Sequence, residues 1–112
     1  MKGLSVRWSL AGAPAGIAAE LREYVAEASY VKFTGMQGLR FKTWRMREGE
    51  WFEGTYVFVS DEARASFQET FTAGAATAPI STMTGAPPTS IEAFEVVAVA
   101  EGWDGFEASA RG

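Results

Sequence analysis

The sequence predicts an α+β domain with the order strand, helix, strand, strand, helix, strand. Three observations support this order. Apolar and polar side chains alternate from Leu4 to Leu10, as in a half-buried strand. An amphipathic run with helical spacing follows it. Residues 40–58 then form two aromatic-rich runs around a short polar turn, a pattern typical of a β-hairpin.

The first half of the chain gives clear boundaries. Gly12-Ala13-Pro14 ends the first strand, and Pro14 is placed to open a helix. We expect that helix to end before Thr34-Gly35. Its apolar positions fall on one face: Ile17, Leu21, Tyr24, Val25 and Ala28. The hairpin strands are expected at about 38–47 and 51–60, on either side of the turn that contains Gly49.

The second half predicts one more helix and one more strand. Ser60 and the acidic residues after it are typical of a helix start, and apolar residues every four positions extend that helix over about 61–72. Residues 72–90 are rich in Ala, Thr, Gly and Pro and predict a long loop, either a lid or a surface connection. Residues 91–100 predict the last strand, and the tail at 101–112 carries Trp103 and Phe106, which need a place to pack. The order is that of a ferredoxin-like βαββαβ fold in one domain, 1–112.

Composition and missing residue types exclude several classes of function. The net charge of −4, from 10 basic and 14 acidic residues, argues against nucleic acid. No apolar run reaches the roughly 18 residues of a membrane span, and Arg7 interrupts any signal-like start, so we expect a cytoplasmic protein. The chain has neither cysteine nor histidine. We therefore expect no metal, haem or other cofactor, and no Ser-His or Cys-His catalysis.

The hairpin register decides which side chains share a face. A register that pairs Trp44 with Gly54 places two sets of residues on opposite faces, and a slip of one residue would mix them. The set expected to face the helices is Leu39, Phe41, Thr43, Thr55, Val57 and Val59. The other set is Arg40, Lys42, Trp44, Met46, Phe52, Gly54, Tyr56 and Phe58. This second set is too aromatic to stay in water, so we expect it to meet another subunit and to enclose a cavity between the two sheets.

A short pattern in this region resembles a known family. It reads Lys42-x-Trp44, then Gly54-x-Tyr56-x-Phe58, then Asp61-Glu62-x-x-Ala65. It resembles the YdhR-like monooxygenases of the dimeric α/β-barrel superfamily, to which the antibiotic-biosynthesis monooxygenases also belong. The match covers about residues 38–67. The resemblance implies a homodimer whose two four-stranded sheets form a barrel-like core, with a cavity in each protomer and oxygenation without metal or flavin. The long Ala/Thr/Gly-rich segment before the last strand departs from the family pattern and leaves pocket shape and substrate open.

The candidate site residues come from the aromatic set. We expect Tyr56, Arg40 and Lys42 to act in catalysis, since a tyrosine hydroxyl can polarise a carbonyl or phenolate oxygen and a cation can hold a substrate anion. The expected substrate-binding residues are Trp44, Phe58, Gly54, Trp8 and Phe52, with Gly54 leaving room beside the Trp44 indole. The alternative for the aromatic residues is a packed core or interface. The alternative for Arg40 and Lys42 is plain exposure or a salt bridge to Glu53 or Glu95. Glu53 is the best carboxylate candidate for a base, although this register puts it on the opposite face.

These observations favour cofactor-independent monooxygenation of a small aromatic, phenolic or enolisable compound. The expected partners are a second copy of the chain, the small aromatic molecule and dioxygen, with no nucleic acid and no membrane. Two alternatives from other classes stay open, because one fold hosts many functions. One is a non-catalytic or stress-response barrel that binds a small hydrophobic ligand. The other is a cyclase, isomerase or lyase on the same scaffold.

Overall fold

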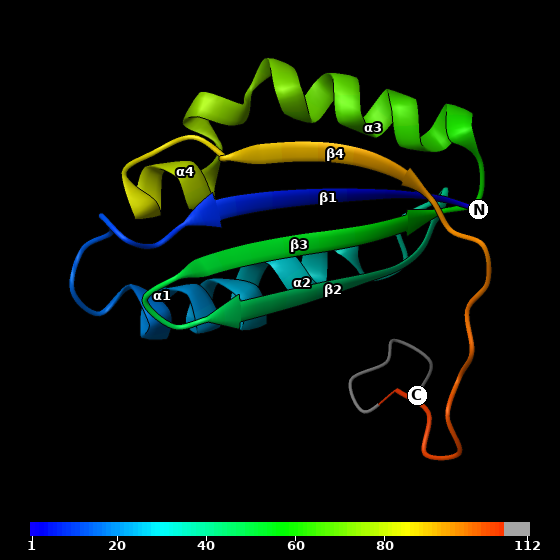
Figure 1. Cartoon of the computed structure of the whole chain (residues 1–112), viewed down its shortest axis with the longest axis horizontal. Helices are drawn as coiled ribbons and strands as arrows, with labels where there is room; N and C mark the ends of the chain where they lie inside the picture. The colour runs from blue at the N-terminus through cyan, green and yellow to red at the C-terminus, as the bar shows by residue number, and fades with distance from the viewer. Residues whose placement is uncertain (107–112) are drawn as a thin grey trace.

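The computed structural model describes residues 1–106, in which four antiparallel strands form one sheet in the order β2-β3-β1-β4. Helical segments follow the first and third strands, and Figure 1 shows α1 and α2 behind β2 and β3. The elements are β1 (Lys2–Ser9), α1 (Ile17–Tyr24), the π-helical turn η1 (Val25–Ser29), α2 (Tyr30–Phe33), β2 (Leu39–Arg47), β3 (Trp51–Phe58), α3 (Asp61–Ala73), the 3-10 turn η2 (Ala75–Thr77), α4 (Pro79–Thr84) and β4 (Ser90–Glu95). The predicted ferredoxin-like fold is confirmed.

Local sequence explains where most elements begin and end. α3 starts after Ser60, whose hydroxyl accepts a hydrogen bond from the Ala63 amide at 3.1 Å, as the sequence predicts. α1 begins later than Pro14, because Gly16 adopts a left-handed conformation with φ of 83° and so separates the proline from the helix. None of the helices among residues 1–106 combines the length and the apolar character needed to cross a membrane.

Two predicted elements need correction. Residues 72–90 are not one long loop, because they contain the end of α3, the turn η2 and the helix α4, which opens at Pro79. The last strand ends at Glu95 and not at residue 100. Beyond it the chain runs away from the sheet without regular structure (Figure 1), with Trp103 fully exposed and the ring of Phe106 5.9 Å from that of Phe41.

The hairpin register is as predicted, but the two faces are exchanged. Trp44 lies opposite Gly54, and a β-bulge falls between Leu39 and Phe41. Beyond the bulge the aromatic set points toward the helices of the same chain, whereas Thr55 and Arg45 lie on the face that no helix covers in residues 1–106. Before the bulge, Leu39 packs against the core as expected, and Arg40 is exposed. The physical reason is area: each aromatic ring has about 150–250 Å² to remove from water, more than the smaller Val and Thr side chains of the other set.

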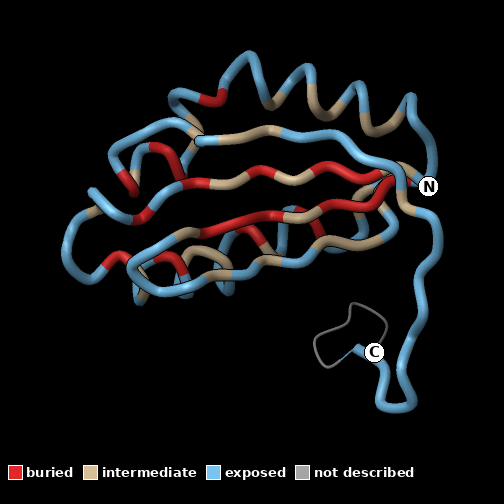
Figure 2. The backbone as a smooth tube through the Cα atoms, in the orientation of Figure 1, coloured by how far each residue is buried: buried red, intermediate tan, exposed pale blue. Residues whose placement is uncertain are grey.

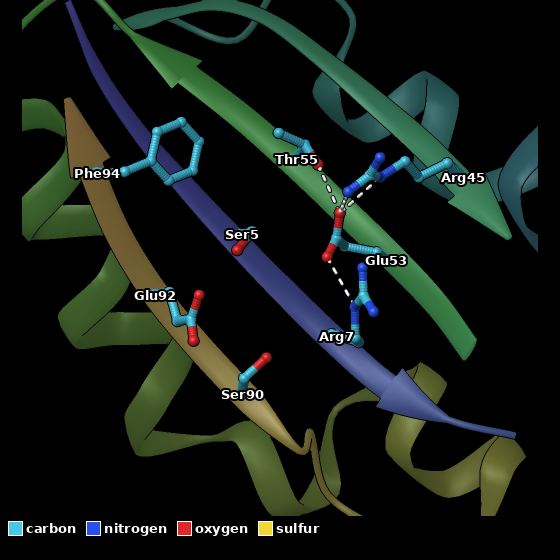
Figure 3. Close-up of a pocket in the computed structure, with 8 residues that line it drawn as sticks. All are labelled: Ser5, Arg7, Arg45, Glu53, Thr55, Ser90, Glu92 and Phe94. Carbon is cyan, nitrogen blue, oxygen red and sulfur yellow. Dashed lines mark hydrogen bonds and ion pairs between the residues drawn. The ribbon is translucent and has the colours of Figure 1, made fainter. Parts of the chain in front are cut away.

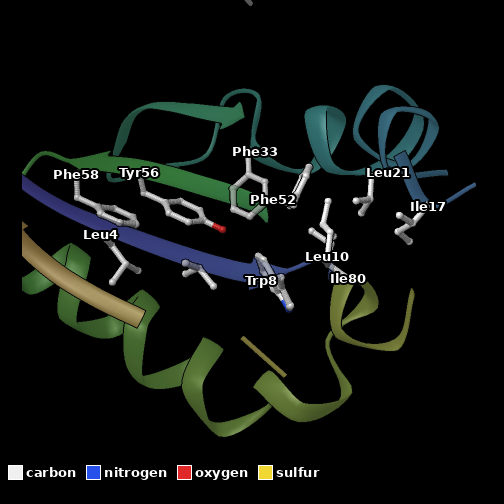
Figure 4. Packing of buried hydrophobic residues seen from close by; sticks show 11 residues of the cluster. Leu4, Trp8, Leu10, Ile17, Leu21, Phe33, Phe52, Tyr56, Phe58 and Ile80 are labelled. Atoms are coloured by element: carbon white, nitrogen blue, oxygen red, sulfur yellow. The ribbon is translucent and has the colours of Figure 1, made fainter. Parts of the chain in front are cut away.

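The core therefore lies between the sheet and the helices of one chain. Figure 2 shows that the buried positions concentrate on the central strands β1 and β3. Leu4, Val6 and Trp8 contribute the buried face of β1, and Leu21 on α1 is fully buried as well. An aromatic layer fills the space (Figure 4), with the Tyr56 and Phe67 rings 4.9 Å apart and the Phe33 and Tyr56 rings 5.5 Å apart. The expected cavity between two sheets cannot be made by these side chains, because they face the helices.

Candidate functional site

A groove of about 550 Å³ lies between the edge strand β2 and the first helical region. Its lining residues are Arg22, Val25, Ala26, Tyr30, Trp44, Arg45, Met46 and Phe52. Most of these side chains are apolar or aromatic, and the volume is in the range of roughly 300–1,000 Å³ typical of small-molecule sites. Trp44 and Phe52 are the two predicted binding residues that line it.

The Trp44 indole is held in place by the π-helical turn. Its Nε1 donates a hydrogen bond to the Ser29 hydroxyl at 2.9 Å, and Ser29 is buried. The Tyr30 ring lies 6.3 Å from it and the Phe33 ring 6.2 Å, both tilted relative to the indole. A π-helical turn of this kind is uncommon and occurs often at functional sites, since it redirects the side chains around it. This turn was not predictable from the sequence, because no residue type in Val25–Ser29 marks it.

The charge at the groove comes from arginine. Arg22 on α1 forms an ion pair with Glu48 of the hairpin turn, and both side chains are 60% exposed. An exposed pair of this kind contributes little to stability. The Arg22 guanidinium is therefore available to an anionic ligand at little cost. Arg22 was not predictable as a site residue, because an arginine on the polar face of a helix is normally solvated.

The remaining predicted residues lie outside the groove. Tyr56, Phe58 and Trp8 are buried in the aromatic layer, where burial raises the pKa of the Tyr56 hydroxyl above its ordinary value. Arg40 is exposed at the β-bulge. Gly54 does not leave a gap beside the indole: a Cβ at this position would lie 3.2 Å from the Lys42 Cε and 3.4 Å from the Tyr56 hydroxyl.

Lys42 has its own enclosure on the other side of Trp44. Its ammonium nitrogen lies 3.6 Å from the centre of the Phe33 ring, 4.3 Å from that of Tyr56 and 4.7 Å from that of Trp44. Burial, with a smaller contribution from the positive charge of Lys32, lowers the pKa of Lys42 to about 6. The expected salt bridges do not form: Glu95 pairs with Lys2, and Glu53 pairs with two arginines on the opposite face of the sheet.

Glu53 occupies a second hollow, of about 420 Å³, on the open face of the sheet (Figure 3). Its carboxylate accepts hydrogen bonds from Arg45 Nε at 2.6 Å, Arg7 Nε at 2.9 Å and Thr55 Oγ1 at 3.1 Å. Burial alone would raise the pKa of Glu53, but these three hydrogen bonds and the charge of Arg45 lower it below its ordinary value. Glu53 is therefore a carboxylate at neutral pH. It is a poor general base, because both of its oxygens are ion-paired with Arg7 and Arg45.

The residues described contain no group of three or more acidic side chains arranged to hold a metal ion. The groove, the Lys42 enclosure and the Glu53 hollow are thus three separate environments on one small sheet. The groove combines an apolar lining with a volume large enough for a ring-sized ligand.

Comparison with known proteins shows the fold and little more. No protein-family model matches the chain, and no curated protein sequence matches it. A protein of unknown function from Nitrosomonas europaea, NE2512, is similar in structure with a TM-score of 0.61 and 22% identity, over 88% of this chain and 91% of that one. A variant of MhuD, crystallised with two manganese protoporphyrin IX molecules per active site, has a TM-score of 0.54 and 19% identity, over 90% of this chain and 98% of that one. At these identities the comparisons establish that the chain shares the ferredoxin-like α+β fold of these two proteins.

Proposed function

We propose that the groove between β2 and the first helical region binds a small flat aromatic molecule, and that the chain oxidises it with dioxygen as a homodimeric monooxygenase of the YdhR-like kind. The observation that carries the proposal is the groove lining. Trp44, Tyr30 and Phe52 offer ring faces, and Met46 offers a polarisable side chain that adapts to a flat ligand. The MhuD variant, which shares the fold, binds a flat porphyrin.

The chemistry needs an electron-rich substrate and no added reductant. A phenol or enol that loses its proton becomes an anion that can pass electrons to dioxygen. With a hydroquinone, one oxygen atom then enters at a ring C–H and the product is the hydroxyquinone, while the other oxygen atom leaves as water. Arg22 is the cation best placed to hold the substrate anion, because Arg45, the other arginine of the groove, is bound to the buried carboxylate of Glu53. Arg22 replaces Arg40, which is exposed at the bulge and does not line the groove.

One observation favours a second function, ligand binding without catalysis. None of the three expected catalytic residues, Tyr56, Arg40 and Lys42, lines the groove. A groove lined by apolar and aromatic side chains and two arginines, without any of the expected catalytic residues, suits a carrier or sensor. The same observation weighs against a cyclase, isomerase or lyase, since those reactions need a positioned proton donor or acceptor.

Calorimetric titration with a naphthohydroquinone, together with oxygen consumption in the absence of metal and flavin, tests the proposal. We expect binding and oxygen uptake by the parent protein. Met46→Trp, which fills the groove, should weaken binding by at least about tenfold, whereas Met46→Leu conserves volume and should retain it. Binding without oxygen uptake would support the carrier, and a Met46→Trp variant that binds as the parent does would show that the groove is not the site.

A further inference from the structure

Lys42 is the one lysine of the chain whose amine points into an aromatic enclosure. The chain has three lysines, Lys2, Lys32 and Lys42. Lys32 is exposed and Lys2 pairs loosely with Glu95 at 4.0 Å. The Lys42 nitrogen instead lies within 5 Å of three ring centres, at 3.6, 4.3 and 4.7 Å. This arrangement is unusual, because the apolar stem of a lysine normally covers apolar surface while its amine reaches water.

The amine has no anionic partner in residues 1–106. The ion pairs of this part of the chain leave it out, and its charged and titratable neighbours are Lys32 on α2 and Tyr56 on β3. Removal from water and a nearby like charge both disfavour the charged ammonium form. Cation–π attraction to the three rings offsets only part of this unfavourable free energy. Desolvation and a second cation are also the two arrangements by which proteins convert a lysine into a nucleophile.

The sequence positions this amine through Gly54. The Lys42 stem crosses β3 where that strand has no side chain, and a Cβ there would lie 3.2 Å from the Lys42 Cε. The Tyr56 hydroxyl would lie 3.4 Å from the same added Cβ. The Lys42 Cε and the Tyr56 hydroxyl therefore pack on the same side of Gly54, and the raised pKa of Tyr56 keeps that phenol protonated as a donor.

We propose that Lys42 is a covalent capture site for small aldehydes and ketones, a property beyond the oxygenation proposed above. The Lys42 nitrogen lone pair attacks the carbonyl carbon, and the carbonyl oxygen takes a proton from the Tyr56 hydroxyl. The nitrogen then gives up a proton to the tyrosinate, which restores the phenol. The phenol then protonates the hydroxyl of the resulting carbinolamine, which leaves as water as the carbon–nitrogen double bond forms, and the nitrogen gives its remaining proton back to the tyrosinate. The net step joins amine and carbonyl into an imine with loss of one water, and nothing is oxidised or reduced.

Reductive trapping on the full chain tests this site. The protein is treated at pH 7 with a limiting amount of propanal and cyanoborohydride, and the modification of each lysine is measured by peptide mass spectrometry. Lys42 should be modified at least about tenfold faster than Lys32, because each pKa unit of depression multiplies the neutral amine fraction about tenfold while lowering its nucleophilicity less. The preference should shrink at pH 10, where Lys32 also becomes neutral. Equal or slower modification of Lys42 at pH 7 would overturn the proposal.

Two controls test whether the reactivity of Lys42 depends on the folded structure around it and not on its neighbours in the sequence. In urea-unfolded protein the three lysines should react alike, and a preference for Lys42 that persists there would count against the site. Tyr56→Phe removes the proton donor with little change in volume, so it should slow modification of Lys42 several-fold and leave Lys32 unchanged. An unchanged Lys42 rate in a folded Tyr56→Phe variant would overturn the role given to the phenol.

Discussion

Lys42 makes the stability of this protein depend on pH through a single side chain. Its pKa is about 6 in the folded state and 10.5 as an ordinary lysine, so folding releases a proton between these values. The free energy of unfolding should therefore fall as the pH is lowered from 10.5 toward 6, and level off below 6. A single group releases at most one proton, so the slope should not exceed about 1.4 kcal/mol per pH unit, and because Lys42 is only half-buried it should stay below this limit.

The measurement is urea unfolding of the parent and of Lys42→Met across that range. The methionine has a similar length and no charge, so the difference between the two proteins isolates the amine. The variant should be the more stable protein at pH 7, and the two should converge near pH 10. Parallel curves over the whole range would show that the amine keeps its ordinary pKa in the fold.

Glu53 is the residue most sensitive to loss of charge. It is 4% exposed and accepts hydrogen bonds from Arg7 and Arg45, so Glu53→Gln should lower the free energy of unfolding by about 1–3 kcal/mol. Glu50→Gln is the matched control, because Glu50 forms an exposed pair with Arg47 and should change stability by less than about 0.5 kcal/mol. The lowered pKa of Glu53 adds stability above the ordinary value of 4.5 that is lost as the pH falls below it. The difference between parent and Glu53→Gln should therefore shrink in acid, and a difference that grows there would contradict the ion-pair account.

At the scale of elements, α4 depends on one buried hydroxyl. Ser81 accepts a hydrogen bond from Trp8 Nε1 at 2.9 Å and donates one to the Ala75 carbonyl at 2.6 Å, so it joins α4 to β1 and η2. Ser81→Ala leaves the indole N–H without a partner and should cost about 1–3 kcal/mol in urea unfolding. Thr82→Ala, one position along on the exposed side of the same helix, should cost less than about 0.5 kcal/mol. Similar losses in the two variants would show that helix propensity, and not this contact, sets the cost.

Most elements were predictable from sequence because each has a local physical cause. Ser60 caps α3, and Gly49 with φ of 77° closes the hairpin turn that fixes the register. The exchange of the two hairpin faces was not predictable from alternation alone. Alternation gives two sets and does not say which one the helices cover, and the aromatic set was wrongly assigned to the interface with a second subunit. The groove was also not predictable from the sequence. Trp44 and Arg22 are 22 positions apart in the chain and come to line one groove only in the folded structure.

At the scale of the whole molecule, the uncovered face of the sheet is neither a core nor an ordinary surface. Phe94 lies across Gly3, where a Cβ would fall 2.0 Å from the ring, and is 38% exposed. Trp51 lies beside the guanidinium of Arg7, whose Cζ is 4.1 Å from the ring centre. Buried Val57 and Glu53 lie on this face between such rings. Apolar rings around satisfied ion pairs are typical of an interface core, in which aromatic residues and arginine are enriched.

We therefore expect this face to pair with that of a second copy of the chain, as the proposed function requires. Phe94→Asp places a charge in the expected interface, and Val31→Asp places the same charge on an apolar residue of α2 that is 66% exposed. A symmetric interface repeats the change on both partners, so one substitution should act twice. Analytical ultracentrifugation at micromolar concentration should show a dimer for the parent and for Val31→Asp, and a monomer for Phe94→Asp. A parent that sediments as a monomer, with the same free energy of unfolding at every protein concentration, would rule this interface out, because unfolding of a dimer depends on concentration by mass action.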